Sequence, residues 1–162
     1  MQHTAYIALG SNMGDRELHL LRAVAEIGSI PGSRITGLSG FYDTEPVGPV
    51  AQERFLNATL RLETELAPAA LLKELQRIET QLFRRKRTVT WGPRPMDLDI
   101  LFFDDLTMAE EALTIPHPLL HERRFVLAPL AELAPDLVHP LLGRRIDDLL
   151  ATLDAPGEVT RI

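Results

Sequence analysis

The stretch FLNATLRLE, residues 55–63, alternates apolar and polar side chains. This period of two predicts a β-strand with one face on a core and the other face in polar surroundings. The core face would carry Leu56, Ala58, Leu60 and Leu62, and the opposite face Phe55, Asn57, Thr59, Arg61 and Glu63. It is the clearest strand in the chain, and the other elements are placed around it.

On the N-terminal side, the pattern predicts a strand, a helix and a second strand. The helix would bury one apolar face and stop at a glycine. A segment rich in Pro and Gly follows the second strand, and this composition is typical of a loop. These segments are Thr4–Leu9 (strand), 10–14 (turn), 16–27 (helix with Leu18, Leu21, Val24 and Ile27 on one face, then Gly28), Ile35–Tyr42 (strand) and Asp43–Glu53 (loop).

On the C-terminal side, Pro68 suits the first turn of a helix that runs to about Phe83. Its apolar stripe would be Leu71, Leu75, Ile78 and Leu82. A loop at 84–95 leads into the strand Met96–Phe103, where Met96, Leu98, Ile100 and Phe102 would share one face and Asp97 and Asp99 the other. Shorter elements follow: a turn at Asp104-Asp105, a strand near Leu113–Ile115, and helices near 121–133 and 144–153.

Through residue 103 the order is therefore strand, helix, strand, strand, helix, strand. This is the split β-α-β pattern of ferredoxin-like α+β folds, with both helices on one face of an antiparallel sheet. The additional C-terminal helices would cover more of the sheet. We expect residues 1–162 to form a single domain, because domains most often run to about 100–150 residues.

Composition excludes several classes of protein. The chain has no Cys, which rules out disulfide frameworks, thiolate catalysis and Cys-ligated metal centres. No signal peptide is visible at the N-terminus, and no apolar run approaches the ~20 residues that span a bilayer. We expect a cytoplasmic protein that does not enter a membrane.

The charge is unevenly distributed. A net charge of −6 argues against a protein devoted to nucleic acid, whose footprint is usually strongly basic. Yet Arg84, Arg85, Lys86 and Arg87 are consecutive, and Arg94 follows. A dense basic loop on an acidic protein indicates a small anionic ligand; the alternative is a solvated surface loop.

Asp97 and Asp99 are the sharpest chemical signal. A spacing of two on a strand puts both carboxylates on one face, roughly 7 Å apart at the backbone. Magnesium takes one or two carboxylates and completes its shell with water and phosphate oxygens. Carboxylates for a metal beside guanidinium groups for phosphate is the arrangement that phosphoryl transfer requires. The alternative is a pair of solvated strand residues.

Other candidates lie nearby in the sequence. Trp91-Gly92-Pro93-Arg94 forms a bent loop with the only Trp of the chain, and His117 stands between Pro116 and Pro118. Gln76 and Glu79 are one helical turn apart on the helix that leads into the basic loop, where they can contact a base or a ribose. Each of these residues also has a purely structural interpretation, as core, ion pair or helix surface.

Several motifs in order carry a resemblance to a known family. They are Gly10-Ser11-Asn12, Phe41-Tyr42-x-Thr44-x-Pro46 with Gly48-Pro49, Phe55-Leu56-Asn57, Trp91-Gly92-Pro93-Arg94-x-x-Asp97-Leu98-Asp99, and Pro116-His117. Together they resemble the 6-hydroxymethyl-7,8-dihydropterin pyrophosphokinases of folate biosynthesis, over about residues 4–140. The stretch from Trp91 to Asp99 is highly specific, whereas the other motifs are weak alone.

The resemblance implies a reaction and a set of roles. The family transfers a diphosphoryl group from ATP to the hydroxymethyl oxygen of the pterin and releases AMP. Asp97 and Asp99 would hold two magnesium ions, and Arg84 and Arg94 would stabilise the charge on the transferring group. ATP would contact Gln76, Glu79, Lys86, Trp91, Ile100, His117 and Arg123, and the pterin would contact Thr44, Val47, Phe55, Asn57 and Phe125.

Physical chemistry agrees with the pterin pocket. A flat heterocycle with an amide edge needs aromatic walls and an Asn or Thr at its rim. Four positions depart from the family pattern: Thr90 replaces a basic residue, Lys86 an arginine, Phe83 a glycine and Phe55 a tyrosine. Thr90, Lys86 and Phe83 belong to the basic loop or its start, so these departures concern the loop and ATP affinity. Lysine, for example, cannot form a bidentate fork to phosphate.

Two other functions stay open from sequence alone. Ferredoxin-like sheets also bind RNA through aromatic side chains on the sheet face, and paired acids also serve magnesium-dependent nucleases. The net charge disfavours the first, and the second leaves the Trp91–Arg94 loop unexplained. We therefore expect small-molecule substrates only, with no nucleic acid partner, in a monomeric enzyme.

Overall fold

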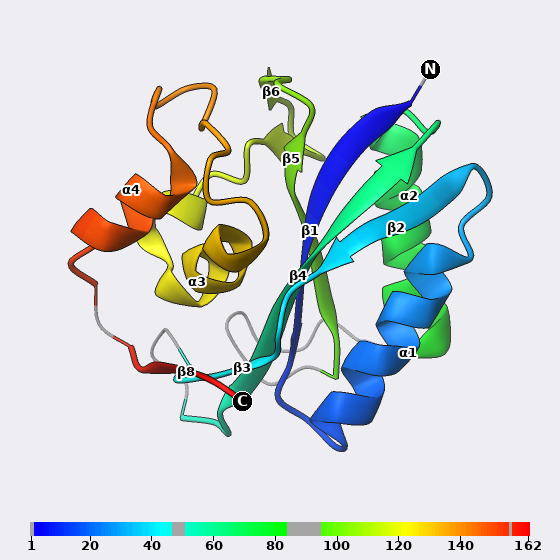
Figure 1. Ribbon diagram of the computed structural model, residues 1–162. Helices are drawn as coiled ribbons and strands as arrows, with labels where there is room; N and C mark the ends of the chain where they lie inside the picture. The colour runs from blue at the N-terminus through cyan, green and yellow to red at the C-terminus, as the bar shows by residue number, and fades with distance from the viewer. Residues whose placement is uncertain (1, 47–50, 84–94, 156) are drawn as a thin grey trace.

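The computed structural model describes residues 2–46, 51–83, 95–155 and 157–162 (Figure 1). Predicted site residues Val47, Arg84, Lys86, Trp91 and Arg94 lie outside this range. The elements are β1 (His3–Ser11), α1 (Arg16–Gly28), β2 (Ser33–Leu38), β3 (Tyr42–Thr44), β4 (Phe55–Thr64), α2 (Pro68–Arg77), the π-helical turn η1 (Ile78–Leu82), β5 (Asp97–Phe103), β6 (Met108–Ala109), β7 (Thr114–Ile115), the 3₁₀ turn η2 (Leu120–Glu122), α3 (Arg124–Leu133), α4 (Ile146–Thr152) and β8 (Val159–Arg161).

An antiparallel sheet organises the molecule. Its strand order is β5-β1-β4-β3-β8, and β2 pairs with β4 beside β3. β4, the strand expected from residues 55–63, pairs with β1, β2 and β3. The order β5, β1, β4, β2 with two helical crossovers is ferredoxin-like, so the predicted fold is confirmed.

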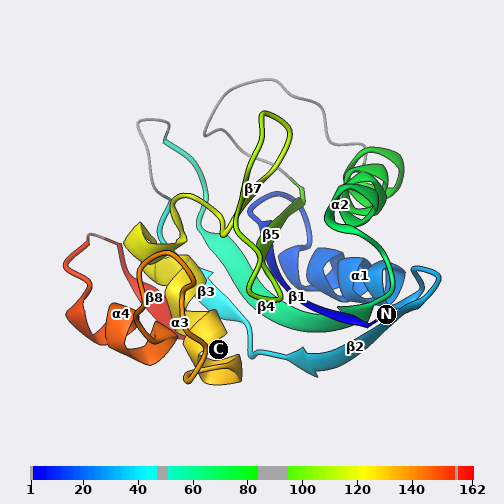
Figure 2. The same ribbon diagram turned by 90° about the horizontal axis from the view of Figure 1, so that it is seen from above.

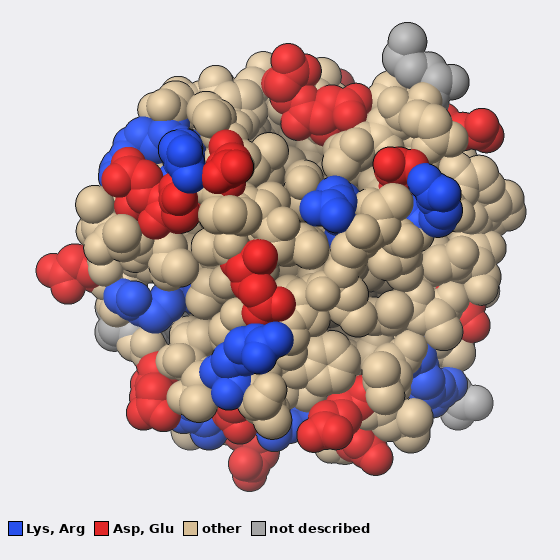
Figure 3. Space-filling view, viewed as in Figure 1, with Lys and Arg blue, Asp and Glu red and all other residues tan. Residues whose placement is uncertain are grey.

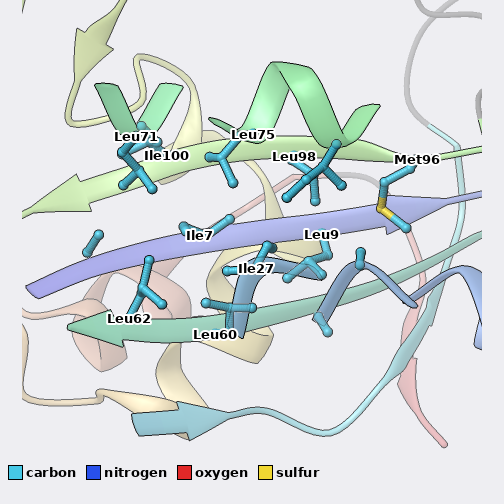
Figure 4. Packing of buried hydrophobic residues seen from close by; sticks show 14 of the residues in the cluster. Ile7, Leu9, Ile27, Leu60, Leu62, Leu71, Leu75, Met96, Leu98 and Ile100 are labelled. Carbon is cyan, nitrogen blue, oxygen red and sulfur yellow. The ribbon is translucent and has the colours of Figure 1, made fainter. Parts of the chain in front are cut away.

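Helices α1 and α2 cover one face of the sheet (Figures 1 and 2). The side chains of Ile7, Leu9, Leu60, Leu62, Leu98 and Ile100 meet those of Ile27, Leu71 and Leu75 from the helices (Figure 4). Leu56, Ala58, Leu60 and Leu62 are all buried, as the alternation predicts.

Helices α3 and α4 lie on the other face, so the sheet is covered on both sides (Figures 1 and 2). Asn57 and Thr59, on the polar side of β4, are therefore buried as well. Tyr6, Leu101 and Phe102 pack against Leu127 and Leu130 of α3 in this second core. The predicted C-terminal cover of the sheet is confirmed.

The predicted apolar face of α1 is wrong. Leu18 and Leu21 are 49% and 54% exposed, whereas Leu20, Ala23 and Ile27 are fully buried. A spacing of three falls behind the helical period of 3.6, so Leu18 and Ile27 point to opposite sides of the helix. The spacing of three then four, from Leu20 through Ala23 to Ile27, follows one face.

Two strand predictions also need correction. The single strand expected at Ile35–Tyr42 is split into β2 and β3, because the Ser39 hydroxyl accepts the Thr59 backbone N–H at 2.9 Å and interrupts the ladder. Asp43 and Thr44, placed in a loop by the sequence, belong to β3. In β5, a register shift after Ile100 turns Phe103 rather than Phe102 toward α1 and α2.

Other boundaries differ less. The helix expected to reach Phe83 changes to a π-helical turn after Arg77. The helices near 121–133 and 144–153 are present as η2 with α3, and as α4. Strands β6 and β8 had no clear sequence signal; β8 pairs with β3 at the edge of the sheet.

The outer surface mixes both signs of charge. On the face shown in Figure 3, acidic and basic side chains are interspersed. Around α4, Arg144 pairs with Asp148 and Arg145 with Asp147. Within the part of the chain that the structure describes, no helix is both long enough and apolar enough to cross a bilayer.

Candidate active site

A cavity of about 480 Å³ opens between the sheet and the segment 117–126. It lies on the sheet face opposite α1 and α2, because the lining residues of β5 alternate with Leu98 and Ile100, which belong to the helix-side core. The lining comprises Ala8, Leu9, Gly10, Thr44, Glu45, Phe55, Asn57, Asp97, Asp99, Leu101, His117, Pro118, Leu119, Arg123, Phe125 and Val126. Most of the predicted site residues that the structure describes meet here.

Asp97 and Asp99 stand at the start of β5, opposite Gly10 and Ala8 of β1. Both are half-buried and line the cavity, while Leu98 between them is buried in the helix-side core. Among the described residues, no three His, Asp or Glu side chains come together to hold one metal ion. Two carboxylates beside a polar cavity fit magnesium, which keeps several ligand positions for water and substrate oxygens.

A polar and aromatic group forms another part of the cavity. The Thr44 hydroxyl donates to Asn57 Oδ1 at 2.6 Å, so the amide nitrogen Nδ2 points toward β1 and Gly10. Phe55 and Phe125 both line the cavity, from β4 and α3. The Arg123 guanidinium lies 5.5 Å from the centre of the Phe125 ring, within range of a cation–π contact. The structure thus brings Thr44, Phe55, Asn57 and Phe125 together.

His117 is held neutral at the cavity. Burial, together with the nearby Arg123 charge, lowers the pKa of His117 to about 4. The Leu119 backbone N–H donates to Nδ1 at 3.2 Å, so the proton of the neutral ring resides on Nε2. His117 is anchored by its own backbone N–H, which donates to the Leu101 carbonyl at 3.0 Å. This ring offers a hydrogen-bond donor without carrying a charge.

Three residues expected to contact ATP do not line the described cavity. Gln76 is exposed on α2, and Ile100 buries its side chain in the helix-side core, so only its backbone is available to a ligand. Glu79 is 8% exposed, and its Oε2 accepts the Leu98 backbone N–H at 2.8 Å. Their contacts with ATP stay predictions.

Sequence reasoning missed the contribution of Gly10 and Asn12. A Cβ on Gly10 would lie 2.7 Å from Asn57 Nδ2, so only glycine leaves room for this amide. Asn12 Nδ2 donates to Gln52 Oε1 at 2.7 Å and to the Glu53 carbonyl at 3.1 Å, which ties the end of β1 to the segment before β4. The motif Gly10-Ser11-Asn12 was visible, but its use depends on the register between β1 and β4.

These features define a class of protein. Paired carboxylates, a cationic side chain and an uncharged donor that line the same cavity as two aromatic rings are suited to phosphoryl transfer onto a small heterocycle. A family model described as 7,8-dihydro-6-hydroxymethylpterin-pyrophosphokinase (HPPK) matches residues 6–135. The chain belongs to this family.

Individual relatives agree with this assignment. The chain is 49% identical over 133 residues to a 2-amino-4-hydroxy-6-hydroxymethyldihydropteridine pyrophosphokinase of Bacillus subtilis, covering 82% of this chain and 79% of that one. It is 43% identical over 153 residues to the protein of the same name from Methylorubrum extorquens, covering 94% and 95%.

A solved structure agrees in fold. The crystal structure of a Plasmodium falciparum HPPK-DHPS with pterin and p-hydroxybenzoate superposes with a TM-score of 0.74 at 18% identity. The match covers 93% of this chain and 44% of that longer chain, so the present chain spans less than half of it. At this identity the likeness shows the fold alone.

Proposed function

We propose that the protein transfers the diphosphoryl group of ATP to the hydroxymethyl oxygen of 6-hydroxymethyl-7,8-dihydropterin, as a step of folate biosynthesis. The observation that carries the proposal is that Asp97 and Asp99 open into the same cavity as Thr44, Asn57, Phe55 and Phe125. Family membership and the names of the relatives support the same reaction.

The reaction balances without any further reactant. The hydroxymethyl oxygen forms a bond to the β-phosphorus of ATP, and the bond from that phosphorus to the oxygen bridging the α-phosphate breaks. AMP leaves with that oxygen, and the hydroxyl proton passes to solvent. The products are AMP and the pterin diphosphate.

In the pterin pocket, Phe55 and Phe125 supply apolar ring surfaces and Asn57 supplies a directed amide. Thr44 donates to Asn57 Oδ1, and Asn57 Nδ2 donates to the Leu9 carbonyl at 3.5 Å, so the second N–H of the amide is the one proposed to meet an acceptor on the ligand edge. Val47, outside the described residues, would complete this pocket. Burial of a flat heterocycle between aromatic rings is the main source of its affinity.

At the phosphate end, Asp97 and Asp99 are the residues that would hold magnesium, and two ions are proposed. Magnesium bound there would neutralise charge on the phosphate oxygens and favour ionisation of the attacking hydroxyl. The chain itself contributes Arg123 and the neutral His117 as donors to ATP. Arg84 and Arg94, outside the described residues, are proposed to stabilise the transferring group, with Gln76, Glu79, Lys86, Trp91 and Ile100 as further ATP contacts.

One assay tests the function directly. The purified protein is incubated with ATP, magnesium chloride and 6-hydroxymethyl-7,8-dihydropterin, and AMP and the pterin diphosphate are separated by chromatography. We expect equal amounts of both products, and none when the pterin or magnesium is omitted. Release of ADP in place of AMP, or of AMP without pterin, would contradict the proposal.

The alternatives carried from the sequence are not favoured. An RNA-binding module does not account for paired acids that line the cavity, and a nuclease does not account for the aromatic walls. The remaining proposals are a monomer, a single domain over 1–162 and a cytoplasmic location, the last because ATP is an intracellular metabolite. Sedimentation of the purified protein tests the first of these.

A further inference from the structure

Glu79 is a carboxylate in an unusual place. It lies in η1, the π-helical turn after α2, and only 8% of it is exposed. A buried charge is costly unless hydrogen bonds compensate it. Its Oε2 accepts the backbone N–H of Leu98 at 2.8 Å. Leu98 is the residue between the two acids of the site.

The position of β5 in the sheet explains why this bond matters. β5 is an edge strand with β1 as its neighbour, so the outward-facing backbone groups of β5 need partners from outside the sheet. α2 packs beside β5, as the side chains of Leu71 and Leu75 next to Ile100 and Leu98 show in Figure 4. The turn η1, which follows α2, then places the Glu79 side chain beside the outer edge of β5 at Leu98.

Glu79 does not act as a third metal ligand. Within the described residues, Asp97, Asp99 and Glu79 do not form a group that could hold one ion together. The directions of the two Asp side chains are set by the backbone that carries them, and Glu79 bonds the peptide unit between them. Residues that orient metal ligands in this way typically change metal affinity about 10–100-fold when removed.

We propose that Glu79 is a positioning residue whose carboxylate oxygen holds the Leu98 peptide so that Asp97 and Asp99 present their carboxylates to the same divalent cations. The role needs the reach of the side chain and a hydrogen-bond acceptor, and it does not need the negative charge. It rests on the proposed function and differs from the direct ATP contact that the family resemblance implies for Glu79.

Two substitutions separate reach from charge. Glu79→Gln keeps the length of the side chain and a carbonyl oxygen that accepts the Leu98 N–H, but removes the charge. Glu79→Asp keeps the charge and withdraws the oxygen by one methylene. Glu74→Gln is the matched control, because Glu74 lies on α2 and its carboxylate pairs with Arg77 at the surface.

Three measurements apply to each variant. Hydrogen exchange of the Leu98 amide is followed by NMR. Binding of Mn²⁺ is followed by electron paramagnetic resonance in the presence of α,β-methylene-ATP, whose α–β linkage cannot be cleaved. Turnover is measured as kcat and as KM for ATP. Thermal melting confirms that each variant is folded.

We expect Glu79→Asp to accelerate Leu98 exchange, weaken Mn²⁺ binding about 10–100-fold and lower kcat more than it raises KM for ATP. Glu79→Gln should leave Leu98 exchange and Mn²⁺ binding close to those of the wild type and of Glu74→Gln, and should lower kcat less than Glu79→Asp does. A larger effect of Glu79→Gln than of Glu79→Asp would overturn the inference. Faster Leu98 exchange in Glu79→Asp with unchanged Mn²⁺ binding would overturn it as well. Failure of the wild type to make AMP would refute the proposed function instead, and the Leu98 and Mn²⁺ measurements would still decide the role of Glu79.

Discussion

Replacing Gly10 by Ala is expected to damage the pterin pocket selectively. Gly10 is opposite Asn57 in the β1–β4 ladder, and its backbone φ is not in the left-handed region. Glycine is therefore needed here for space alone. A Cβ would lie 2.7 Å from Asn57 Nδ2 and 3.7 Å from Cδ1 of Phe55.

The size of the effect follows from this geometry. The amide must retreat by about 0.8 Å to reach an ordinary contact distance. That movement strains the 2.6 Å bond from Thr44 to Asn57 and misaligns the amide toward its ligand. With each hydrogen bond worth about 1 kcal/mol, pterin affinity should fall by about 1–2 kcal/mol, or roughly 5–30-fold. Overpacking should also lower the free energy of unfolding by about 1–3 kcal/mol.

Isothermal titration measures this loss. Pterin is titrated into protein saturated with magnesium and α,β-methylene-ATP, and the nucleotide is titrated separately. Nucleotide affinity should hardly change. The Asn57→Ala background is the control, since Gly10→Ala should cost little there once the amide is gone. An equal loss of pterin affinity in both backgrounds would refute the reasoning.

Three further outcomes are expected. Asp97→Asn should remove most of the turnover, through a loss of several kcal/mol of transition-state stabilisation, with an unchanged melting temperature; near wild-type activity at saturating magnesium would disprove the metal assignment. Phe125→Ala should weaken pterin binding by about 1–3 kcal/mol in calorimetry and leave the nucleotide almost unaffected, whereas equal weakening of both would place this wall wrongly. Burial and the neighbouring His121 lower the pKa of His139 below its ordinary 6.5, so the unfolded chain takes up this proton first and stability falls as the pH drops below about 6.5. Urea denaturation at pH 7.5 and pH 5 should show a smaller drop for His139→Asn, and an equal drop would exclude His139 as the cause.

The order of elements could be predicted because β4 and β5 have a period of two, and α2 has a regular apolar stripe. The errors have local causes. In α1, two apolar rows of residues can be drawn on the sequence, one through Leu21 and one through Leu20. Only packing against the sheet shows that Leu20 is the one that faces the core. The break after Leu38 depends on a bond between Ser39 and Thr59, 20 residues apart in sequence.

The sequence identified some residues of the candidate site and missed the role of others. Asp97 and Asp99 were marked by their spacing on an apolar strand, Thr44 and Asn57 by the family motifs, and Phe125 only by what the family resemblance implies. The need for Gly10 comes from a cross-strand approach that sequence spacing does not encode. Glu79 was singled out as an ATP contact, yet the π-helical turn that buries it against Leu98 has no sequence signature.

The structure shows what Phe83 contacts at the position where the family pattern has glycine. It is 8% exposed and packs in the helix-side core, with the His19 ring at 5.5 Å between centroids and the Arg22 guanidinium 5.7 Å from its ring. The chain therefore enters the segment 84–94 from a fixed point.

The side chains of β5 alternate between the hydrophobic core and the cavity. Leu98 and Ile100 must face α1 and α2 to be buried, and a strand then turns Asp97 and Asp99 to the opposite face. A slip of one residue would put both acids into the apolar core and two apolar side chains into the cavity. The register shift after Ile100 comes beyond both acids, so it turns Phe102 to the α3 side, which Leu101 already faces, without moving Asp97 or Asp99 off the site face. The same hydrophobic contacts that hold α2 against the sheet therefore turn the two carboxylates toward the cavity.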